Sequence, residues 1–214
     1  MTALPARSWS PGRACLLAAA LLSLTCGCQP AWAGEPRRVI AVVPMGKVDA
    51  QRLALVAEAL RGAYDADTRI EPSRELPPDA YWAPRKRWRA EKLLRSVERD
   101  FPEGAWKAVL VTEAEISTTK EKIEDWGIGG LGIIGGRTCV VSTFLIRRHS
   151  PERAKLDERL RKLAVHELGH TLGLDHCDVF ACVMRDARGK LISSLDGTQE
   201  TFCGRCRSVV KRAE

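Results

Sequence analysis

The chain has 214 residues, of which 45% are hydrophobic and 29% are charged, and its formal net charge is +7. This length supports one domain with a sizeable core, and the sequence contains no internal repeat and no low-complexity linker. The basic residues are spread along the chain. Their densest group, Arg85 to Arg89, falls in a predicted helix, where a solvated face accounts for it. We therefore expect no nucleic-acid partner.

The first 33 residues have the pattern of a secretory signal peptide. Arg7 and Arg13 give a basic start, residues 14–24 are mainly apolar, and Ala31 and Ala33 form a small-residue cleavage site. The apolar stretch is too short for a transmembrane helix, and no later segment is apolar enough to span a membrane. The sequence therefore predicts an exported protein, either periplasmic or secreted.

Cleavage after Ala33 leaves residues 34–214 as a single domain, which we expect to be a monomer. The alternative is a lipid anchor on Cys26 or Cys28. Neither cysteine has a leucine three residues before it, as a lipidation signal requires. The intact mass of the exported protein separates the two alternatives, because only one of them carries an acyl chain.

Predicted strands and helices alternate over the rest of the chain. Short apolar runs bounded by turn residues predict strands at Val39–Pro44, Thr68–Glu71, Ala105–Thr112 and Thr138–Ile146. Helix-forming residues predict helices at Asp49–Ala63, Arg85–Asp100 and Pro151–Leu174. The proline-rich segment Glu75–Pro84 predicts a loop. This order indicates an α/β fold with a mostly parallel twisted sheet backed by helices.

A glycine-rich segment follows the strand predicted at Ala105–Thr112. Gly127, Gly129 and Gly132 have the spacing GxGxxG, which binds dinucleotides when a strand precedes it and a helix follows it. Here a predicted strand follows, so we expect no dinucleotide. The segment predicts a mobile loop and an edge strand.

The segment HELGHTLGLDH, which begins inside the last predicted helix, has the spacing of a catalytic zinc site. His166 and His170 are four residues apart and lie on one helix face, so both can bind the same ion. Gly173 permits a positive φ that ends the helix and brings His176 round as a third ligand. Three protein ligands leave the fourth position open, which distinguishes a catalytic zinc from a structural one. Glu167 can reach a water in that position without being a ligand itself.

Four cysteines form two short-spaced pairs after this segment. Cys177 and Cys182 make one pair, and Cys203 and Cys206 make the other. Such pairs are the usual ligands of a closed, structural zinc site. Because the predicted compartment is oxidising, a disulfide within each pair is the alternative. Cys139 lies in a predicted strand, where we expect a buried, small apolar residue.

The run HELGHTLGLDHC, the later tripeptide CVM and the final CGRC together resemble the archaemetzincin (archaelysin) family of metzincin zinc metallopeptidases. Looser similarity lies upstream, in VIAVVPMG, YWAPRKRWRAEKLL, VLVTEAEI and CVVSTFLIRR. The resemblance covers essentially the whole chain after the signal peptide, and its last third is the most diagnostic. It implies a metzincin fold, with the zinc cleft between the sheet and a small irregular C-terminal subdomain that holds the four cysteines.

The resemblance also implies roles for individual residues. It places a catalytic zinc on His166, His170 and His176, a general base at Glu167, and a packing residue beneath the site at Met184. It places a second, structural zinc on the four cysteines. The substrate would be a peptide or protein aligned along the glycine-rich edge strand, and the family favours aminopeptidase activity on small peptides. The alternative is a non-catalytic, zinc-stabilised binding protein, although such a protein has no use for Glu167.

Peptide hydrolysis passes through a tetrahedral oxyanion that needs stabilising beyond the zinc. The chain has 2 tyrosines that could donate a phenolic hydrogen bond, Tyr64 and Tyr81. Neither lies near the histidine motif in the sequence, so the sequence predicts no residue for this role.

Overall fold

A five-stranded sheet forms the centre of the computed structural model, which describes residues 37–149 and 152–213. Its strands follow the spatial order β2 (Asp67–Ile70), β1 (Val39–Met45), β5 (Lys107–Thr112), β9 (Thr138–Ser142) and β8 (Gly130–Gly132). The first four are parallel, and β8 is antiparallel to β9 at the edge. The predicted signal peptide, with Cys26 and Cys28, lies outside the described residues.

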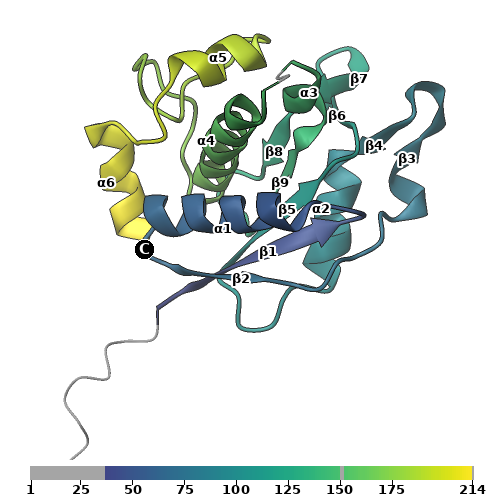
Figure 1. The fold of residues 1–214 in the computed structure, drawn as a ribbon, viewed down its shortest axis with the longest axis horizontal. Coiled ribbons are helices and arrows are strands. Elements are labelled where there is room, and N and C mark those ends of the chain that lie inside the picture. The colour runs from purple at the N-terminus through teal and green to yellow at the C-terminus, as the bar shows by residue number, and fades with distance from the viewer. Residues whose placement is uncertain (1–36, 150–151, 214) are drawn as a thin grey trace, which may run out of the picture. The chain divides into compact units, whose positions relative to one another are not determined.

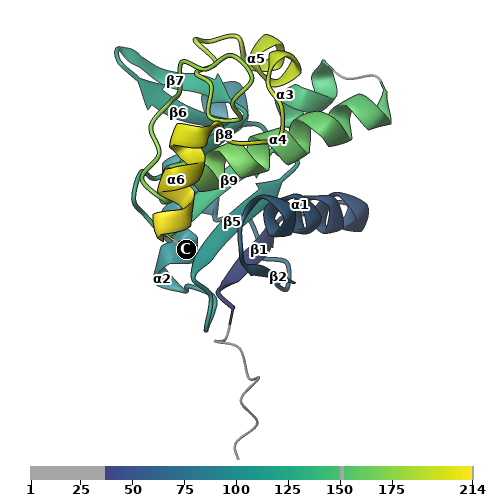
Figure 2. The same cartoon turned by 90° about the vertical axis from the view of Figure 1, so that its left-hand side faces the viewer.

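Three helices cover the two faces of this sheet (Figures 1 and 2). Helices α1 (Ala50–Ala63) and α4 (Arg153–Thr171) pack on one face, and α2 (Ala90–Arg99) packs on the other. Successive strand residues point to opposite faces, so Val42 belongs to the core under α1 and α4 while Val43 belongs to the core under α2. A mostly parallel sheet covered on both faces confirms the predicted α/β class.

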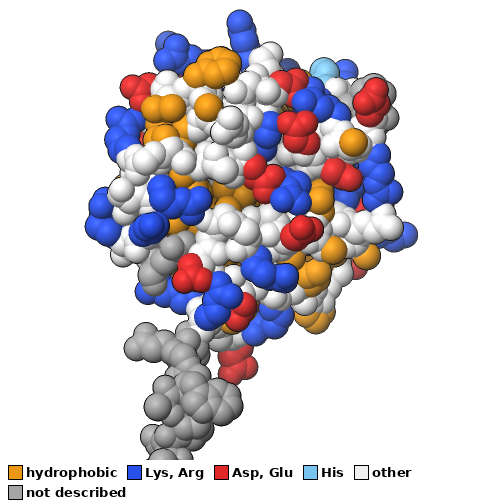
Figure 3. Space-filling view, turned by 60° about the vertical axis from the view of Figure 1, so that its left-hand side comes forward, with side chains coloured by type: hydrophobic (Ala, Val, Ile, Leu, Met, Phe, Trp, Pro, Cys, Tyr) orange, Lys and Arg blue, Asp and Glu red, His pale blue; other side chains and the backbone are white. Residues whose placement is uncertain are grey.

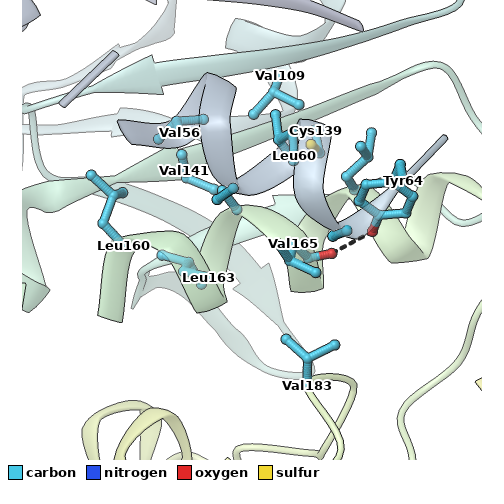
Figure 4. Close-up of a cluster of buried hydrophobic side chains, with 14 of the residues drawn as sticks. Val56, Leu60, Tyr64, Val109, Cys139, Val141, Leu160, Leu163, Val165 and Val183 are labelled. Atoms are coloured by element: carbon cyan, nitrogen blue, oxygen red, sulfur yellow. Dashed lines mark hydrogen bonds between the residues drawn. The ribbon is translucent and has the colours of Figure 1, made fainter. Parts of the chain in front are cut away.

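The larger core joins α1, the sheet and α4 (Figure 4). Its side chains come from all three layers and include Val56, Leu60, Val109, Val141, Leu160 and Leu163. Tyr64, directly after α1, donates a hydrogen bond of 2.6 Å from its hydroxyl to the carbonyl oxygen of Val165 on α4. This contact holds the end of α1 against the part of α4 in which the histidine motif begins.

A second sheet has four strands in the order β3 (Tyr81–Trp82), β4 (Arg87–Arg89), β6 (Ile116–Lys120) and β7 (Ile123–Ile128). The predicted helix Arg85–Asp100 is therefore wrong at its start, since the helix begins at Ala90. Pairing of β4 with β6 outweighs the local helix propensity of this stretch. The predicted loop Glu75–Pro84 is likewise wrong in part, because it contains β3, the 3-10 turn Pro78–Ala80 and the start of a second one, Ala83–Arg85.

The predicted strand Thr138–Ile146 ends at Ser142, where α3 (Thr143–Arg148) begins. The hydroxyl of Ser142 accepts a hydrogen bond of 3.1 Å from the backbone N–H of Phe144, as a helix N-cap does. The C-terminal part is irregular apart from two short helices, α5 (Leu191–Gly197) and α6 (Gly204–Ala213). Within residues 37–149 and 152–213, no helix is both long and apolar enough to cross a membrane.

Acidic and basic side chains are mixed on the surface. On the face shown in Figure 3, Lys and Arg side chains lie among Asp and Glu side chains. The basic stretch 85–89 shows the same mixing on a smaller scale, because Arg87 pairs with Glu115 at 2.8 Å and with Asp125 at 3.2 Å. Much of the positive charge of this stretch is thus compensated locally.

Candidate active site

The three histidines of the motif converge at the C-terminal half of α4. His166 and His170 lie one turn apart on this helix, and their Nε2 atoms are 3.1 Å from each other. His176 comes from the segment after the helix. One ring nitrogen from each of the three lies within 4.8 Å of the others. The structure therefore brings together all three histidines that the sequence selects.

Gly173 makes the turn that returns His176 to the helix. Its φ is +85°, and its backbone N–H donates to the carbonyl oxygen of His170 at 2.9 Å. The N–H of Leu174 reaches back to Gly169 at 3.3 Å. These bonds satisfy the last carbonyl groups of α4, as in helices that end in a left-handed glycine. A side chain at position 173 would strain this backbone conformation.

Backbone carbonyl groups orient the two helical histidines. Nδ1 of His166 lies 2.8 Å from the carbonyl oxygen of Val183, and Nδ1 of His170 lies 2.7 Å from that of Leu174. A carbonyl oxygen only accepts, so Nδ1 carries the proton in both rings and each Nε2 keeps a free lone pair. Burial lowers the pKa of His166 to about 3 and lowers that of His170 as well. Both rings are therefore neutral at physiological pH, as metal ligands must be.

The ring of His176 is held less tightly. Half of its side chain is exposed, and its Nδ1 lies 4.0 Å from the nearer carboxylate oxygen of Asp186. This distance is too long for a direct hydrogen bond. The ring of His176 instead packs against the rings of His166 and His170, with centroid distances of 5.4 Å and 4.9 Å.

Glu167 is buried beside the histidines and lines the same cleft. Burial raises the pKa of its carboxyl to about 8, although a hydrogen bond from the backbone of Gly132 acts to lower it. Strand β8 passes very close to this side chain. A Cβ atom on Gly130 would lie 2.5 Å from Oε1 of Glu167, so a larger residue would displace the carboxylate. The glycine-rich segment predicted as an edge strand is confirmed as β8, and this close approach to α4 explains its composition.

Met184 is fully buried against the active-site helix α4. Its Sδ atom would be 2.5 Å from a Cβ atom on Gly169, which sits between Leu168 and His170 on α4. The methionine therefore fills the space that the glycine leaves on the helix. This contact is packing, as the sequence predicts for this residue.

The four cysteines form a second cluster. Their sulfur atoms all lie within 4.8 Å of one another, and the Sγ atoms of Cys177 and Cys203 are 3.7 Å apart. All four are free thiols in the structure, so neither of the two alternative disulfides is formed. A hydrogen bond from the backbone of Cys206 lowers the pKa of Cys203 to about 7, which favours a thiolate. Four converging sulfur donors fit a closed zinc site.

Cys139 is separate from this cluster and is fully buried in β9, as predicted. Burial raises the pKa of its thiol well above the ordinary value. A neutral thiol in this position behaves as a small apolar side chain.

A cavity of about 430 Å³ opens beside His166, Glu167 and His176. Its aliphatic lining residues are Ile128, Leu131, Leu145, Leu163, Val183, Ala187, Leu191 and Leu195. Helix α5, the β6–β7 hairpin and residues 185–189 contribute to these walls, and none of them was predicted. Leu191 and Leu195 are four residues apart, a helical spacing that could have indicated α5.

A helix that carries HExxHxxGxxH above a buried methionine defines a metallopeptidase of the metzincin class. The sequence model of peptidase family M54 matches residues 87–212, which is more than half of the chain. The chain belongs to this family, the archaemetzincins, and the predicted resemblance is confirmed.

Several known archaemetzincins are similar to this chain over nearly their whole length. That of Halobacterium salinarum is 31% identical over 79% of this chain and 97% of its own. The archaemetzincin of Haloarcula marismortui is 30% identical over 78% of this chain and 95% of its own. Archaemetzincin from Archaeoglobus fulgidus was solved as a complex with malonate. It is 26% identical over 80% of this chain and 99% of its own, with a TM-score of 0.67. Archaemetzincin from Methanopyrus kandleri shares the fold, with a TM-score of 0.71 at 24% identity.

Proposed function

We propose that this member of the zinc metallopeptidase family hydrolyses peptide bonds in the cleft beside α4. In this proposal His166, His170 and His176 hold the catalytic zinc, and the four cysteines hold a structural one. The convergence of three ring nitrogens within 4.8 Å, at the wall of an open cleft, carries the proposal. When bound by three neutral imidazoles, zinc supplies a Lewis acid with its full positive charge.

Glu167 would act as the general base and then as the general acid. Its carboxyl faces the cleft next to the histidines. The positive charge of a bound zinc would favour the ionised form of this carboxyl, which can take a proton from the attacking water and return it to the leaving amine. Strand β8 fixes this carboxyl from one side, because the glycines of the strand lie against it. The backbone therefore limits the positions that the carboxylate can take.

The free edge of β8 supports a way of holding the substrate. Among the strands of the central sheet, β8 pairs only with β9, and its Leu131 lines the cleft. An extended peptide can add to such an edge by backbone hydrogen bonds while its side chains enter the cavity. We propose small peptides as substrates, with removal of N-terminal residues as the preferred reaction, in the compartment outside the cytoplasm.

Digestion of a peptide library, read by mass spectrometry, tests this function. The zinc-loaded protein is compared with its Glu167→Gln variant, which keeps the shape of the side chain but cannot take a proton. Cleavage by the wild type alone supports the proposal, and the positions cut separate N-terminal trimming from internal cleavage. Equal cleavage by both proteins would refute the role of Glu167. Cleavage by neither, with zinc present in both, would favour the non-catalytic binding protein.

A further inference from the structure

The charged side chains that line the cleft are mostly positive. Among its described lining residues, the only carboxylates are Glu167 and Asp186, whereas Lys120, Arg185 and Arg188 carry positive charge. Arg185 is engaged elsewhere, since its guanidinium stacks on the ring of Phe180 at 4.1 Å. Lys120 and Arg188 are therefore the two cations of the cleft that remain to be explained.

Among the described residues, neither Lys120 nor Arg188 forms an ion pair through its side chain. The ammonium group of Lys120 lies 5.3 Å from the centre of the Trp126 ring. The basic stretch 85–89 is different, because Arg87 is held between two carboxylates. Unpaired cations on a cleft wall are available to a ligand.

Both cations are carried by ordered turns. Lys120 ends β6 at the tip of the β6–β7 hairpin, whose two strands Arg89 ties together by donating to the side chain of Thr119 at 2.7 Å and to the carbonyl of Glu124. The backbone N–H of Arg188 donates to the carboxylate of Asp186 at 2.8 Å. An ordered backbone reduces the loop entropy that binding of a ligand must remove.

Both cations lie on the same cleft as the histidine cluster. Lys120 and Arg188 line it together with His176 and Asp186. The carboxylate of Asp186, which accepts the hydrogen bond from the backbone N–H of Arg188, lies 4.0 Å from Nδ1 of His176. One negative charge cannot balance two positive ones, so this part of the cleft has a net positive charge before any metal is added.

We infer that Lys120 and Arg188 determine specificity, by selecting peptides with a carboxylate close to the scissile bond. The inference rests on the proposed peptidase function and extends it to a substrate class. A carboxylate can come from an Asp or Glu side chain or from the C-terminus of a short peptide, and both have the chemistry that these cations recognise. The aliphatic walls of the cavity would receive a neighbouring apolar side chain.

Matched peptides test the inference on the zinc-loaded protein. The two peptides of a pair differ only in having Glu or Gln at one of the two positions that flank the scissile bond. Each peptide is made with a free and with an amidated C-terminus. We expect the wild type to prefer the Glu peptide, or the free C-terminus, by about three- to tenfold in kcat/KM. High salt should reduce this preference, because the groups involved are exposed. A preference seen only between Glu and Gln peptides identifies a side-chain carboxylate as the recognised group. A preference seen only between free and amidated C-termini identifies the C-terminal carboxylate.

The variants Lys120→Glu and Arg188→Glu should each abolish or invert this preference. Lys122→Glu is the matched control, because Lys122 lies on the same hairpin, is exposed and does not line the cleft. It makes the same change in net charge and should leave the preference as it is in the wild type. Since the preference is a ratio within one preparation, partial unfolding or incomplete zinc loading cannot produce the expected change.

Binding measurements separate failure of this inference from failure of the proposed function. Fluorescence anisotropy with labelled Glu and Gln peptides is carried out on the Glu167→Gln variant, alone and combined with Lys120→Glu. Tighter binding of the Glu peptide that Lys120→Glu removes would support the inference even if no peptide is cleaved. Cleavage without any preference between the peptides, or equal binding of both, would overturn it.

Discussion

Nδ1 of His166 lies 2.8 Å from the carbonyl oxygen of Val183, so the first histidine of the motif rests on the residue that follows Cys182. The next carbonyl along, that of Met184, accepts a hydrogen bond of 2.7 Å from the N–H of Cys177. One short stretch of backbone therefore contacts both candidate metal centres. A change in the cysteine cluster can reach the histidine cluster through this stretch.

This arrangement predicts that the two centres are coupled. The double substitution Cys203→Ser with Cys206→Ser should weaken zinc binding at the histidines by about tenfold or more, since groups that orient metal ligands typically contribute that much. Competition with a chelator of known affinity measures the dissociation constant, and the absorption of bound Co²⁺ shows whether sulfur or nitrogen ligands hold the metal. Cys139→Ala is the control, because Cys139 lies outside the cluster. Unchanged affinity in the double variant would show that the centres are independent.

The contact of β8 with Glu167 predicts a second effect. Gly130→Ala places a Cβ atom 2.5 Å from Oε1 of this carboxylate, so the side chain or the strand must move. A displacement of about 1 Å at a catalytic group can cost on the order of a hundredfold in rate. We expect kcat/KM to fall to that extent while zinc content stays the same. Gly62→Ala on α1, where an added Cβ atom meets nothing within 4 Å, is the control and should be as active as the wild type.

The position of Tyr64 predicts a stability effect without a catalytic one. Its hydroxyl donates to the carbonyl of Val165 at 2.6 Å, in the core and away from the cleft lining. Tyr64→Phe should lower the free energy of unfolding by about 1 kcal/mol, the typical net worth of a buried hydrogen bond. Denaturant titration measures this loss. A large fall in kcat with normal stability would instead give Tyr64 a part in oxyanion stabilisation.

The sequence predicts those parts of the site that depend on local geometry. His166 and His170 need only the helical repeat to share a face, and Gly173 signals the turn that returns His176. The central strand Val39–Met45 is recognisable because a strand buried on both faces is apolar along its length. In each case the information lies within one short segment.

The sequence does not predict features that arise from contacts between distant segments. Arg87–Arg89 consists of residues that tolerate a helix, and it becomes a strand because Ile116–Ser117 offers it a partner. The cleft cations are a similar case. Lys120 and Arg188 are ordinary surface residues in the sequence, and only the folded chain brings them to the wall of one cleft.

The ion pair between Arg159 of α4 and Asp196 of α5 predicts how stability depends on pH. Two hydrogen bonds, at 2.9 Å and 2.7 Å, join the guanidinium to the carboxylate. Together with Lys155, Arg159 lowers the pKa of Asp196 to about 2. In the unfolded chain the pKa of this carboxyl is about 3.9, so the folded state binds the proton less readily. The stabilisation is therefore complete above about pH 5 and is lost as the pH falls toward 2.

Asp196→Asn should lower the free energy of unfolding by about 1 kcal/mol at pH 7, a value discounted because the carboxylate is partly exposed. For a domain of this size the loss corresponds to roughly 2–4 °C in melting temperature. Calorimetry between pH 7 and pH 3 should show this difference shrinking below pH 5, as the wild-type carboxylate takes up its proton. Asp157→Asn is the matched control, since Asp157 makes only a looser pair, at 3.6 Å, with Arg153 on the same helix. A difference between wild type and Asp196→Asn that stays constant over this range would mean that packing of α5, and not the charge of Asp196, accounts for the loss.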